Sequence, residues 1–177
     1  GSTVFGQKFT HEISKDWTGK VCEYLVKGID YAESLSYVDR DRKAAAGASF
    51  GGFMMNWFAG KLPDEFKTII VHDGTFNTHS QWGSPEELWF EEYEHGGTPW
   101  ENPDHYDSIS PDSNAKAFKT PMLIIHGELD FRIPYTQAIQ AFTTMQRKGI
   151  PSKLVLFPDE NHWVLKPGNS RFWHQTV

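Results

Sequence analysis

The sequence is poor in cysteine and in positive charge. Cys22 is its only cysteine, which excludes an internal disulfide and a zinc site built from a cysteine cluster. Its 17 lysines and arginines stand against 23 aspartates and glutamates, a net charge of −6. This excess of acid disfavours nucleic acid and anionic membranes as main partners.

Long apolar runs and repeats are also lacking. No stretch of 18 apolar residues occurs, so the sequence predicts no membrane-spanning helix. A length of 177 residues favours a single domain. Aromatic residues, in contrast, make up 15% of the chain and include seven tryptophans, which indicates a core or a cleft lined with rings.

Strand-like and helix-like segments alternate along the chain. Short apolar stretches predict strands over residues 43–48, 66–73, 120–126 and 152–157. The small residues of the first stretch are typical of a buried strand. Helices are predicted over residues 21–36, 50–58, 134–148 and 168–177, and residues 1–10 are predicted to be a loop. This alternation indicates an α/β fold, with a mostly parallel sheet and helices on both faces.

Residues 75–118 contain no second clear strand and are predicted to form a lid or a wall beside a site. They include an acidic helix over residues 85–94. Its acidic side chains are interpreted as a solvated helix face rather than a cation site; they are Glu86, Glu87, Glu91, Glu92 and Glu94.

A candidate nucleophile follows the first predicted strand. Gly47, Ser49 and Gly51 fit the nucleophile-elbow pattern, in which a strained strand-to-helix turn projects a serine hydroxyl. The glycines let the backbone pass close to itself. The same turn directs the backbone N–H of Phe50 toward the place where an oxyanion would form. The pattern is short and needs support from the rest of the chain.

That support comes from two residues placed after later strands. Asp130 follows the third predicted strand and His162 follows the fourth, where the catalytic groups of such sheets gather. The order serine, aspartate, histidine is that of α/β-hydrolases. The chemistry predicts Ser49 as nucleophile, His162 as base and Asp130 as the acid that orients it. Glu128 and Asp159 remain alternatives for the acid.

No metal site is predicted, because no pair of histidines has ligand spacing. His72 and His126 are predicted to have hydrogen-bonded packing roles at strand ends. Several aromatic residues are candidates for a substrate pocket, although packing in the core or lid is the favoured alternative for them; they are Phe53, Trp57, Trp82, Trp89, Phe90 and Trp163.

Five motifs together resemble the catalytic domain of the prolyl oligopeptidase family of serine peptidases, in its dipeptidyl-peptidase V and acylaminoacyl-peptidase-like branch. They lie at residues 47–54, 72–76, 87–90, 126–130 and 157–164. The resemblance implies a partial α/β-hydrolase fold and the triad Ser49, Asp130 and His162. It also implies hydrolysis of short peptides near their N-terminus, with no metal or organic cofactor, and favours a secreted or periplasmic location over a cytoplasmic one.

The resemblance also implies missing parts. Family members carry an N-terminal β-propeller, and their hydrolase domain opens with several strands and a His-Gly-Gly-type loop that supplies a second oxyanion donor. No His-Gly-Gly occurs in the 48 residues before Ser49. We therefore expect residues 1–177 to be one truncated catalytic domain, without the first strands and the propeller.

Truncation leads to two further expectations. An unpaired sheet edge favours a homo-oligomer or a domain-swapped dimer. Loss of one oxyanion donor typically lowers the rate about 10²–10³-fold, so this chain is expected to hydrolyse small esters with poor peptidase activity, or to have no activity. Two alternatives stay open: a carboxylesterase of the same fold, and a catalytically silent interaction fragment.

Overall fold

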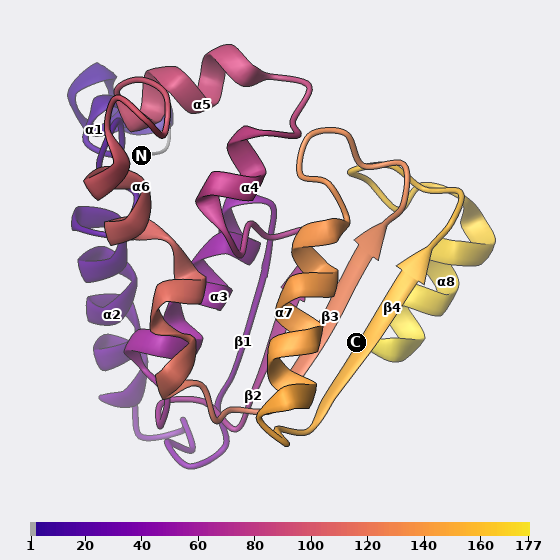
Figure 1. The fold of residues 1–177 in the computed structure, drawn as a ribbon. Coiled ribbons are helices and arrows are strands. Elements are labelled where there is room, and N and C mark those ends of the chain that lie inside the picture. Colours follow the sequence, from indigo (N-terminus) through magenta and orange to yellow (C-terminus); the bar gives the residue numbers. More distant parts are fainter. Residues whose placement is uncertain (1–2) are drawn as a thin grey trace.

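A four-stranded parallel sheet is the centre of the structure, a computed structural model that describes residues 3–177 (Figure 1). Its strands are β1 (Ala44–Ala48), β2 (Thr68–His72), β3 (Met122–Gly127) and β4 (Ser152–Phe157). They lie side by side in the order of the sequence, and each neighbouring pair is parallel. The predicted α/β fold with a parallel sheet is confirmed.

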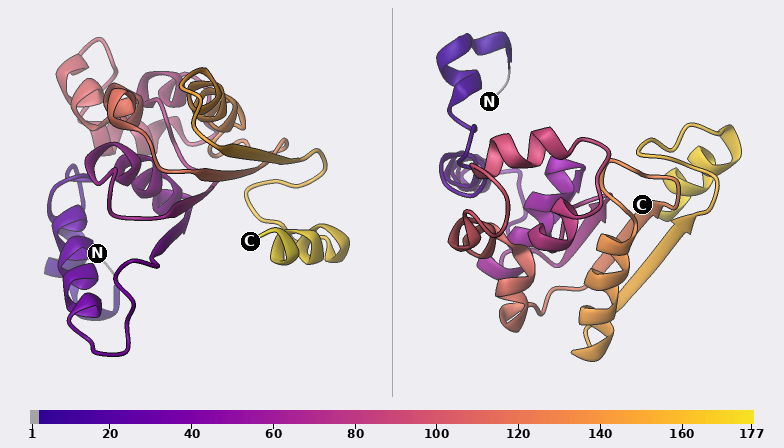
Figure 2. Two further views of the ribbon diagram at one scale, coloured as in Figure 1. Left: turned by 90° about the horizontal axis from the view of Figure 1, so that it is seen from below. Right: turned by 45° about the horizontal axis from the view of Figure 1, so that its top comes forward.

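Helices cover both faces of this sheet (Figure 2). One face carries α3 (Phe50–Lys61) and α7 (Thr136–Arg147), and the other carries α8 (Pro167–Thr176). The N-terminal elements are η1 (Thr3–Phe5), α1 (Gln7–His11) and α2 (Lys20–Glu33). Between β2 and β3 the chain forms α4 (Thr78–Trp82), α5 (Leu88–His95), α6 (Pro103–Ile109) and η2 (Pro111–Ala117).

The apolar core is divided between the two faces. Alternate residues of a strand point to opposite faces, and β3 shows this clearly: Met122 and Ile124 belong to the large cluster with α3 and α7. Leu123 and Ile125 belong to a small cluster on the face of α8. β3 is therefore covered on both faces, as is usual for a parallel strand with helices on each side of the sheet.

Helix α3 is apolar on all sides because it is enclosed on all sides. Its residues from Gly52 to Ala59 are all buried, between the sheet and the segment that follows β2. Gly52 makes the closest approach: a Cβ atom there would lie 2.4 Å from the carbonyl oxygen of His72. The absence of a side chain at Gly52 therefore allows the elbow helix to rest directly on the end of β2.

The prediction of a loop over residues 1–10 is wrong in part. Residues 1 and 2 lie outside the described part of the chain, but η1 and α1 occupy most of Thr3–His11. Ring contacts stabilise this segment: Phe9 packs edge-on against Phe5 and Tyr24, with ring centroids 5.4 and 6.3 Å apart. The contact with Tyr24 joins two separate elements, so local composition gave no sign of it.

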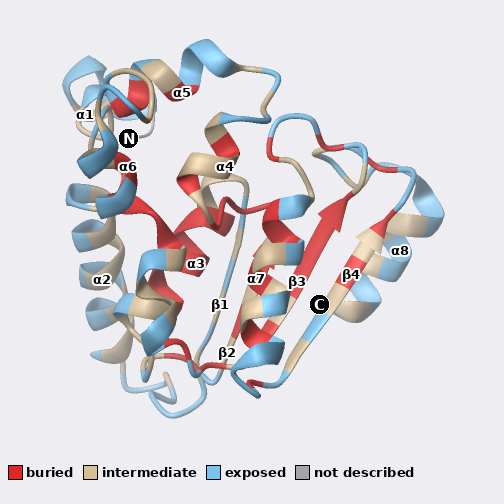
Figure 3. Cartoon of the chain, in the orientation of Figure 1, coloured by how far each residue is buried: buried red, intermediate tan, exposed pale blue. Residues whose placement is uncertain are grey.

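The prediction of a buried first strand is also wrong. Residues of β1 alternate between exposed and half-buried, whereas β3 is almost wholly buried (Figure 3). Among residues 3–177, β1 pairs with β2 alone. Small apolar residues of this kind suit a strand with neighbours on both sides, but here one side is bare.

The acidic helix is only partly a solvated face. Glu91 and Glu94 of α5 are 5% and 9% exposed, which contradicts the prediction for these two residues. Glu94 accepts hydrogen bonds from Trp17 Nε1 and from the backbone N–H of Lys15, both at 3.0 Å. Burial of a carboxylate requires such partners, and here they come from the N-terminal segment.

Candidate active site

Ser49 occupies a strained turn between β1 and α3. Its φ of 58° and ψ of −122° lie outside the regions that L-residues ordinarily adopt. Gly47 makes the turn possible, because a Cβ atom there would lie 2.3 Å from the carbonyl oxygen of Gly51. The geometry is that of a nucleophile elbow. It leaves Phe50 as the first residue of α3, where a helix offers its N–H no internal acceptor.

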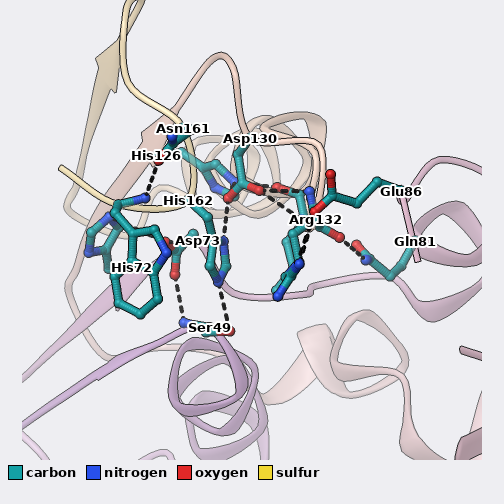
Figure 4. Close-up of polar contacts among 12 residues, drawn as sticks. Ser49, His72, Asp73, Gln81, Glu86, His126, Asp130, Arg132, Asn161 and His162 are labelled. Carbon is teal, nitrogen blue, oxygen red and sulfur yellow. Dashed lines mark hydrogen bonds and ion pairs between the residues drawn. The ribbon is translucent and has the colours of Figure 1, made fainter. Parts of the chain in front are cut away.

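A hydrogen-bonded relay joins three side chains from different parts of the chain (Figure 4). His162 Nε2 lies 2.9 Å from Ser49 Oγ, and His162 Nδ1 lies 2.7 Å from Asp130 Oδ2. In this arrangement the ring can accept the hydroxyl proton at Nε2 while its Nδ1–H donates to the carboxylate.

Asp130 is held in place by the loop that follows β3. Its Oδ1 accepts the backbone N–H groups of Arg132 and Ile133, each at 2.9 Å. Burial alone would raise the pKa of Asp130, but hydrogen bonds from His126, His162 and the Ile133 N–H outweigh burial and hold this pKa well below its usual range. Asp130 is therefore ionised at neutral pH.

The pKa of His162 is shifted in the opposite direction to that of Asp130. Burial lowers its pKa, but the hydrogen bond to Asp130 and the nearby charge of Asp73 outweigh burial, so the pKa of His162 lies above its ordinary value. A carboxylate at Nδ1 thus favours the imidazolium that forms when the ring takes a proton.

Asp73 completes the polar cluster and was not among the predicted site residues. It follows β2, and its side chain is 2% exposed. Its Oδ1 accepts the backbone N–H of Ser49 at 2.6 Å, and its Oδ2 lies 3.5 Å from His162 Nδ1. The signal was present in the sequence, because Asp73 follows a strand just as Asp130 does. Each of the four strands thus delivers one residue: Ser49, Asp73, Asp130 and His162.

A cavity of about 250 Å³ opens beside Ser49. Its apolar walls come from α3, from α5 and from two connecting segments, and they include Trp17, Phe50, Phe53, Phe90 and Ile133. Its polar lining includes Gln81, Glu91 and Arg132. The cavity is therefore mostly apolar with a few convergent polar groups, as sites for small ligands and side chains usually are.

The family profile of the prolyl oligopeptidase family, peptidase S9, matches residues 1–177, the whole sequence. This chain belongs to the prolyl oligopeptidase family. The predicted resemblance is confirmed, and the relay around Ser49 is accordingly found in a family of serine peptidases.

Relatives within the prolyl oligopeptidase family are much longer. The chain is 45% identical over 179 residues to dipeptidyl-peptidase 5 of Schizosaccharomyces pombe, of which it covers 26%. It is 47% identical to a probable dipeptidyl-peptidase 5 of Emericella nidulans, of which it covers 25%. The chain thus spans about a quarter of the length of these relatives.

The chain also matches only part of each similar solved structure. An acylaminoacyl peptidase from Pyrococcus horikoshii superimposes on 89% of this chain with a TM-score of 0.83 at 26% identity, and 26% of that protein is matched. An acylaminoacyl peptidase in complex with Z-Gly-Gly-Phe-chloromethyl ketone superimposes on 96% of the chain with a TM-score of 0.86, again at 26% identity, and 28% of that protein is matched.

Among the contacts of residues 3–177, neither alternative acid is hydrogen-bonded to His162. Asp159 is exposed and pairs with Lys166 at 2.6 Å and with Asn169 at 2.9 Å. Glu128 is half-buried, and its backbone N–H donates to the carbonyl oxygen of Phe157. Asp130 is the carboxylate at hydrogen-bond distance from His162.

The six predicted pocket aromatics separate into two groups. Phe53 and Phe90 line the cavity beside Ser49. The other four do not line it. Trp57 is buried in the core with Lys61 over its ring.

The remaining three lie nearer the surface of the molecule. Trp82 packs edge-on against Trp100, with ring centroids 4.8 Å apart. Trp89 and Trp163 are 67% and 65% exposed. The ring of Trp163 lies 5.7 Å from that of His162, at the outer side of the relay.

The structure bears on three further predictions. His126 is buried, and its Nε2 lies 2.6 Å from the carbonyl oxygen of Ile133, as expected for a packing role. Within residues 3–177, one group of potential metal ligands converges: atoms of Asp73, Asp130 and His162 lie within 4.8 Å of one another. Within this group, Asp130 Oδ2 and His162 Nδ1 are hydrogen-bonded to each other. None of the described helices is long and apolar enough to span a bilayer.

Proposed function

We propose that this chain carries the acyl-transfer centre of a serine peptidase of the prolyl oligopeptidase type. The observation that supports it is the continuous relay from Ser49 Oγ through His162 to Asp130, with distances of 2.9 and 2.7 Å. These distances lie in the range over which a base can take a nucleophile's proton.

The reaction follows from this geometry. Ser49 Oγ attacks the carbonyl carbon of the substrate while His162 Nε2 takes its proton, and the N–H of Phe50 donates to the oxyanion that forms. His162 then gives the proton to the leaving amine, which departs and leaves an acyl-enzyme on Ser49. Water, deprotonated by the same ring, releases the acid product.

The substrate class is a short peptide cleaved near its N-terminus. The names of the relatives, dipeptidyl-peptidase 5 and acylaminoacyl peptidase, support this assignment. We assign the cavity beside Ser49 to the side chain of the residue that contributes the scissile carbonyl. Residues 75–118 act as its wall, since Thr75, Gln81, Phe90 and Glu91 belong to this segment and line the cavity.

We assign the bare side of β1 to packing against further protein. A groove of about 870 Å³ runs along this side, with a largely apolar lining that includes Phe9, Tyr24, Phe50, Met54 and Met55. In a chain as long as the relatives, upstream strands and a propeller domain would cover this region. In the 177-residue chain alone, a second copy takes their place and forms an oligomer.

Labelling with a fluorophosphonate tests the centre itself, because only an activated serine reacts. We expect the wild-type chain to be labelled and the Ser49→Ala variant to remain unlabelled. Ser34→Ala is a matched control that removes an exposed hydroxyl at the end of α2, and it is expected to label like wild type. Absence of labelling in the wild type would support a silent interaction fragment.

A pair of substrates then separates peptidase from esterase. The chain is assayed on a dipeptide anilide and on a p-nitrophenyl ester under the same conditions. Turnover of both, abolished by Ser49→Ala, supports a peptidase. Ester hydrolysis with no amide hydrolysis would support a carboxylesterase instead.

A further inference from the structure

We propose that Asp73 is a second positioning carboxylate of this site, which anchors the nucleophile elbow with one oxygen and backs His162 beside Asp130 with the other. The proposal rests on the function proposed above for Ser49 and His162. It assigns a role to a residue that lies outside the serine, histidine and aspartate relay.

The first oxygen of Asp73 acts on the elbow. The Ser49 N–H lies 2.6 Å from Asp73 Oδ1 and 3.1 Å from the carbonyl oxygen of His72, so both acceptors come from the end of β2. Ser49 has a positive φ, a strained conformation that persists only when its surroundings hold it. A buried carboxylate that accepts this N–H supplies such a hold, because charge-assisted hydrogen bonds are the stronger ones.

The second oxygen of Asp73 faces the base. Oδ2 lies 3.5 Å from His162 Nδ1, whereas Asp130 Oδ2 lies 2.7 Å from the same nitrogen. A single Nδ1–H can donate well to one acceptor, and Asp130 holds it by its shorter distance. A small turn of the ring would bring Asp73 within hydrogen-bond distance. Both carboxylates are 2% exposed, so water screens neither of them from the ring.

The two carboxyl groups have different electrostatic surroundings. Burial raises the pKa of Asp73, and the nearby His72, His162 and Ser49 N–H offset burial only in part. The pKa of Asp130 lies below its usual range, as described above. Like charges close together disfavour each other's ionisation, so removal of the Asp130 charge should favour the charged form of Asp73.

Other titratable groups also face this cluster. His72 Nε2 lies 3.4 Å from Asp73 Oδ2, and burial lowers the pKa of His72, which favours its neutral form. His126 Nε2 lies 3.3 Å from Asp130 Oδ2. Arg132 lowers the pKa of His162. These residues are unchanged in every variant proposed below.

The consequence is that either Asp130 or Asp73 can accept the Nδ1–H of His162. In Asp130→Ala, the shortened side chain frees the Nδ1–H of His162, and Asp73 takes it. In Asp73→Asn, the amide carbonyl oxygen can still accept the Ser49 N–H, so the anchor is kept while the charge is removed. The two variants therefore separate the charge of Asp73 from its structural bond.

Titration of the His162 ring by nitrogen-edited NMR is the decisive measurement, because it does not depend on the reactivity of the serine. Four proteins are compared: wild type, Asp73→Asn, Asp130→Ala and the double variant. We expect Asp73→Asn to lower the pKa of His162 moderately in the wild type and by a larger amount in Asp130→Ala. Equal decreases in the two backgrounds would overturn the proposal, since they would show that Asp73 does not replace Asp130.

The single variant Asp130→Ala gives a second criterion if Asp73→Asn fails to fold. With Asp73 behind the ring, the pKa of His162 stays above 6.5 in this variant despite burial. A value below 6.5 would contradict the proposal. Circular dichroism spectra establish which variants are folded.

Fluorophosphonate labelling rates extend the test to function. Loss of the triad aspartate typically lowers activity about 10⁴-fold; with Asp73 as a replacement, we expect a loss of roughly 10²-fold in Asp130→Ala and about 10⁴-fold in the double variant. Asp159→Asn, which changes an exposed carboxylate in the loop of His162, is the matched control. A wild-type chain that is not labelled would count against the proposed function, whereas the NMR titration decides on Asp73 in either case.

Discussion

The carboxyl ends of the strands and the outer side of β1 differ sharply in how far their residues are buried. At the carboxyl ends of the strands, four side chains form a buried polar network in which Asp73 and Asp130 are each 2% exposed (Figure 4). Along the outer side of β1, alternate residues are exposed and an apolar groove remains open. The carboxyl ends are closed by their own side chains, whereas the outer side of β1 is open.

The difference shows where the geometry of the site comes from. Ser49 lies on the strand with the bare side, yet its N–H is held by His72 and Asp73 from the opposite, paired side. Parallel pairing brings the ends of neighbouring strands to one edge. The relay can therefore assemble from β1 to β4 without any contact on the bare side, and the following predictions test this independence.

The largest effect is expected for His162→Ala. Loss of the base in a serine, histidine and aspartate triad lowers turnover about 10⁶-fold. We expect labelling of Ser49 by a fluorophosphonate to fall to background while the circular dichroism spectrum is unchanged. His174→Ala, on the exposed side of α8, should label like wild type. Equal labelling of the two variants would show that the relay is not assembled in this chain.

Gly52→Ala should destabilise the fold at the point where α3 rests on β2. The new Cβ would lie 2.4 Å from the His72 carbonyl oxygen, which is fixed backbone, and overpacking of this kind costs about 1–3 kcal/mol. Gly51→Ala is the matched control, because its Cβ meets no atom within 4 Å. We expect it to stabilise the helix by about 0.5–1 kcal/mol. Urea denaturation measures both, and equal effects would contradict this account of the elbow.

The dependence of labelling on pH should report the ionisation of His162. In the proposed mechanism the neutral ring is the base. Asp130 and Asp73 outweigh the effect of burial and hold the pKa of His162 above the ordinary 6.5. The labelling rate should therefore be low in acid and rise to a plateau above that pKa. Arg132 lowers this pKa, so Arg132→Gln should move the midpoint to higher pH. Arg147→Gln, on an exposed turn of α7, should leave it in place, and a rate independent of pH would exclude His162 as the base.

The smallest effect on stability is expected for a substitution on the exposed side of β1. Ala46→Lys places a charge on the exposed side of β1, next to the groove. Surface changes of this kind usually alter the free energy of unfolding by less than about 0.5 kcal/mol, but a lysine on an edge strand opposes pairing with another chain. Gel filtration should show an oligomer for wild type and a monomer for Ala46→Lys. Thr143→Lys on α7 should leave the oligomer intact, and a monomeric wild type would refute association through β1.

Much of the fold could be predicted because its signals are local. Short apolar runs between segments of helical spacing located all four described strands, and β4 has the predicted bounds of residues 152–157. The helical segments η1 and α1 were missed because the ring contact of Phe9 with Tyr24 joins separate elements. The burial of Glu91 and Glu94 was missed because their partners, such as Trp17 and Gln81, come from elsewhere in the chain.

The sequence by itself determined the order and type of the reactive groups. An elbow glycine pattern around Ser49 and polar residues after later strands are local features, and they require no knowledge of distance. The tertiary structure alone decided which carboxylates meet His162. Asp130, Asp73, Glu128 and Asp159 all follow strands, and only the parallel pairing of β2 with β3 and β4 puts the first two beside the ring at 2.7 and 3.5 Å. The distance between a carboxylate and His162 decides whether that carboxylate belongs to the relay, and strand pairing sets this distance rather than position along the chain.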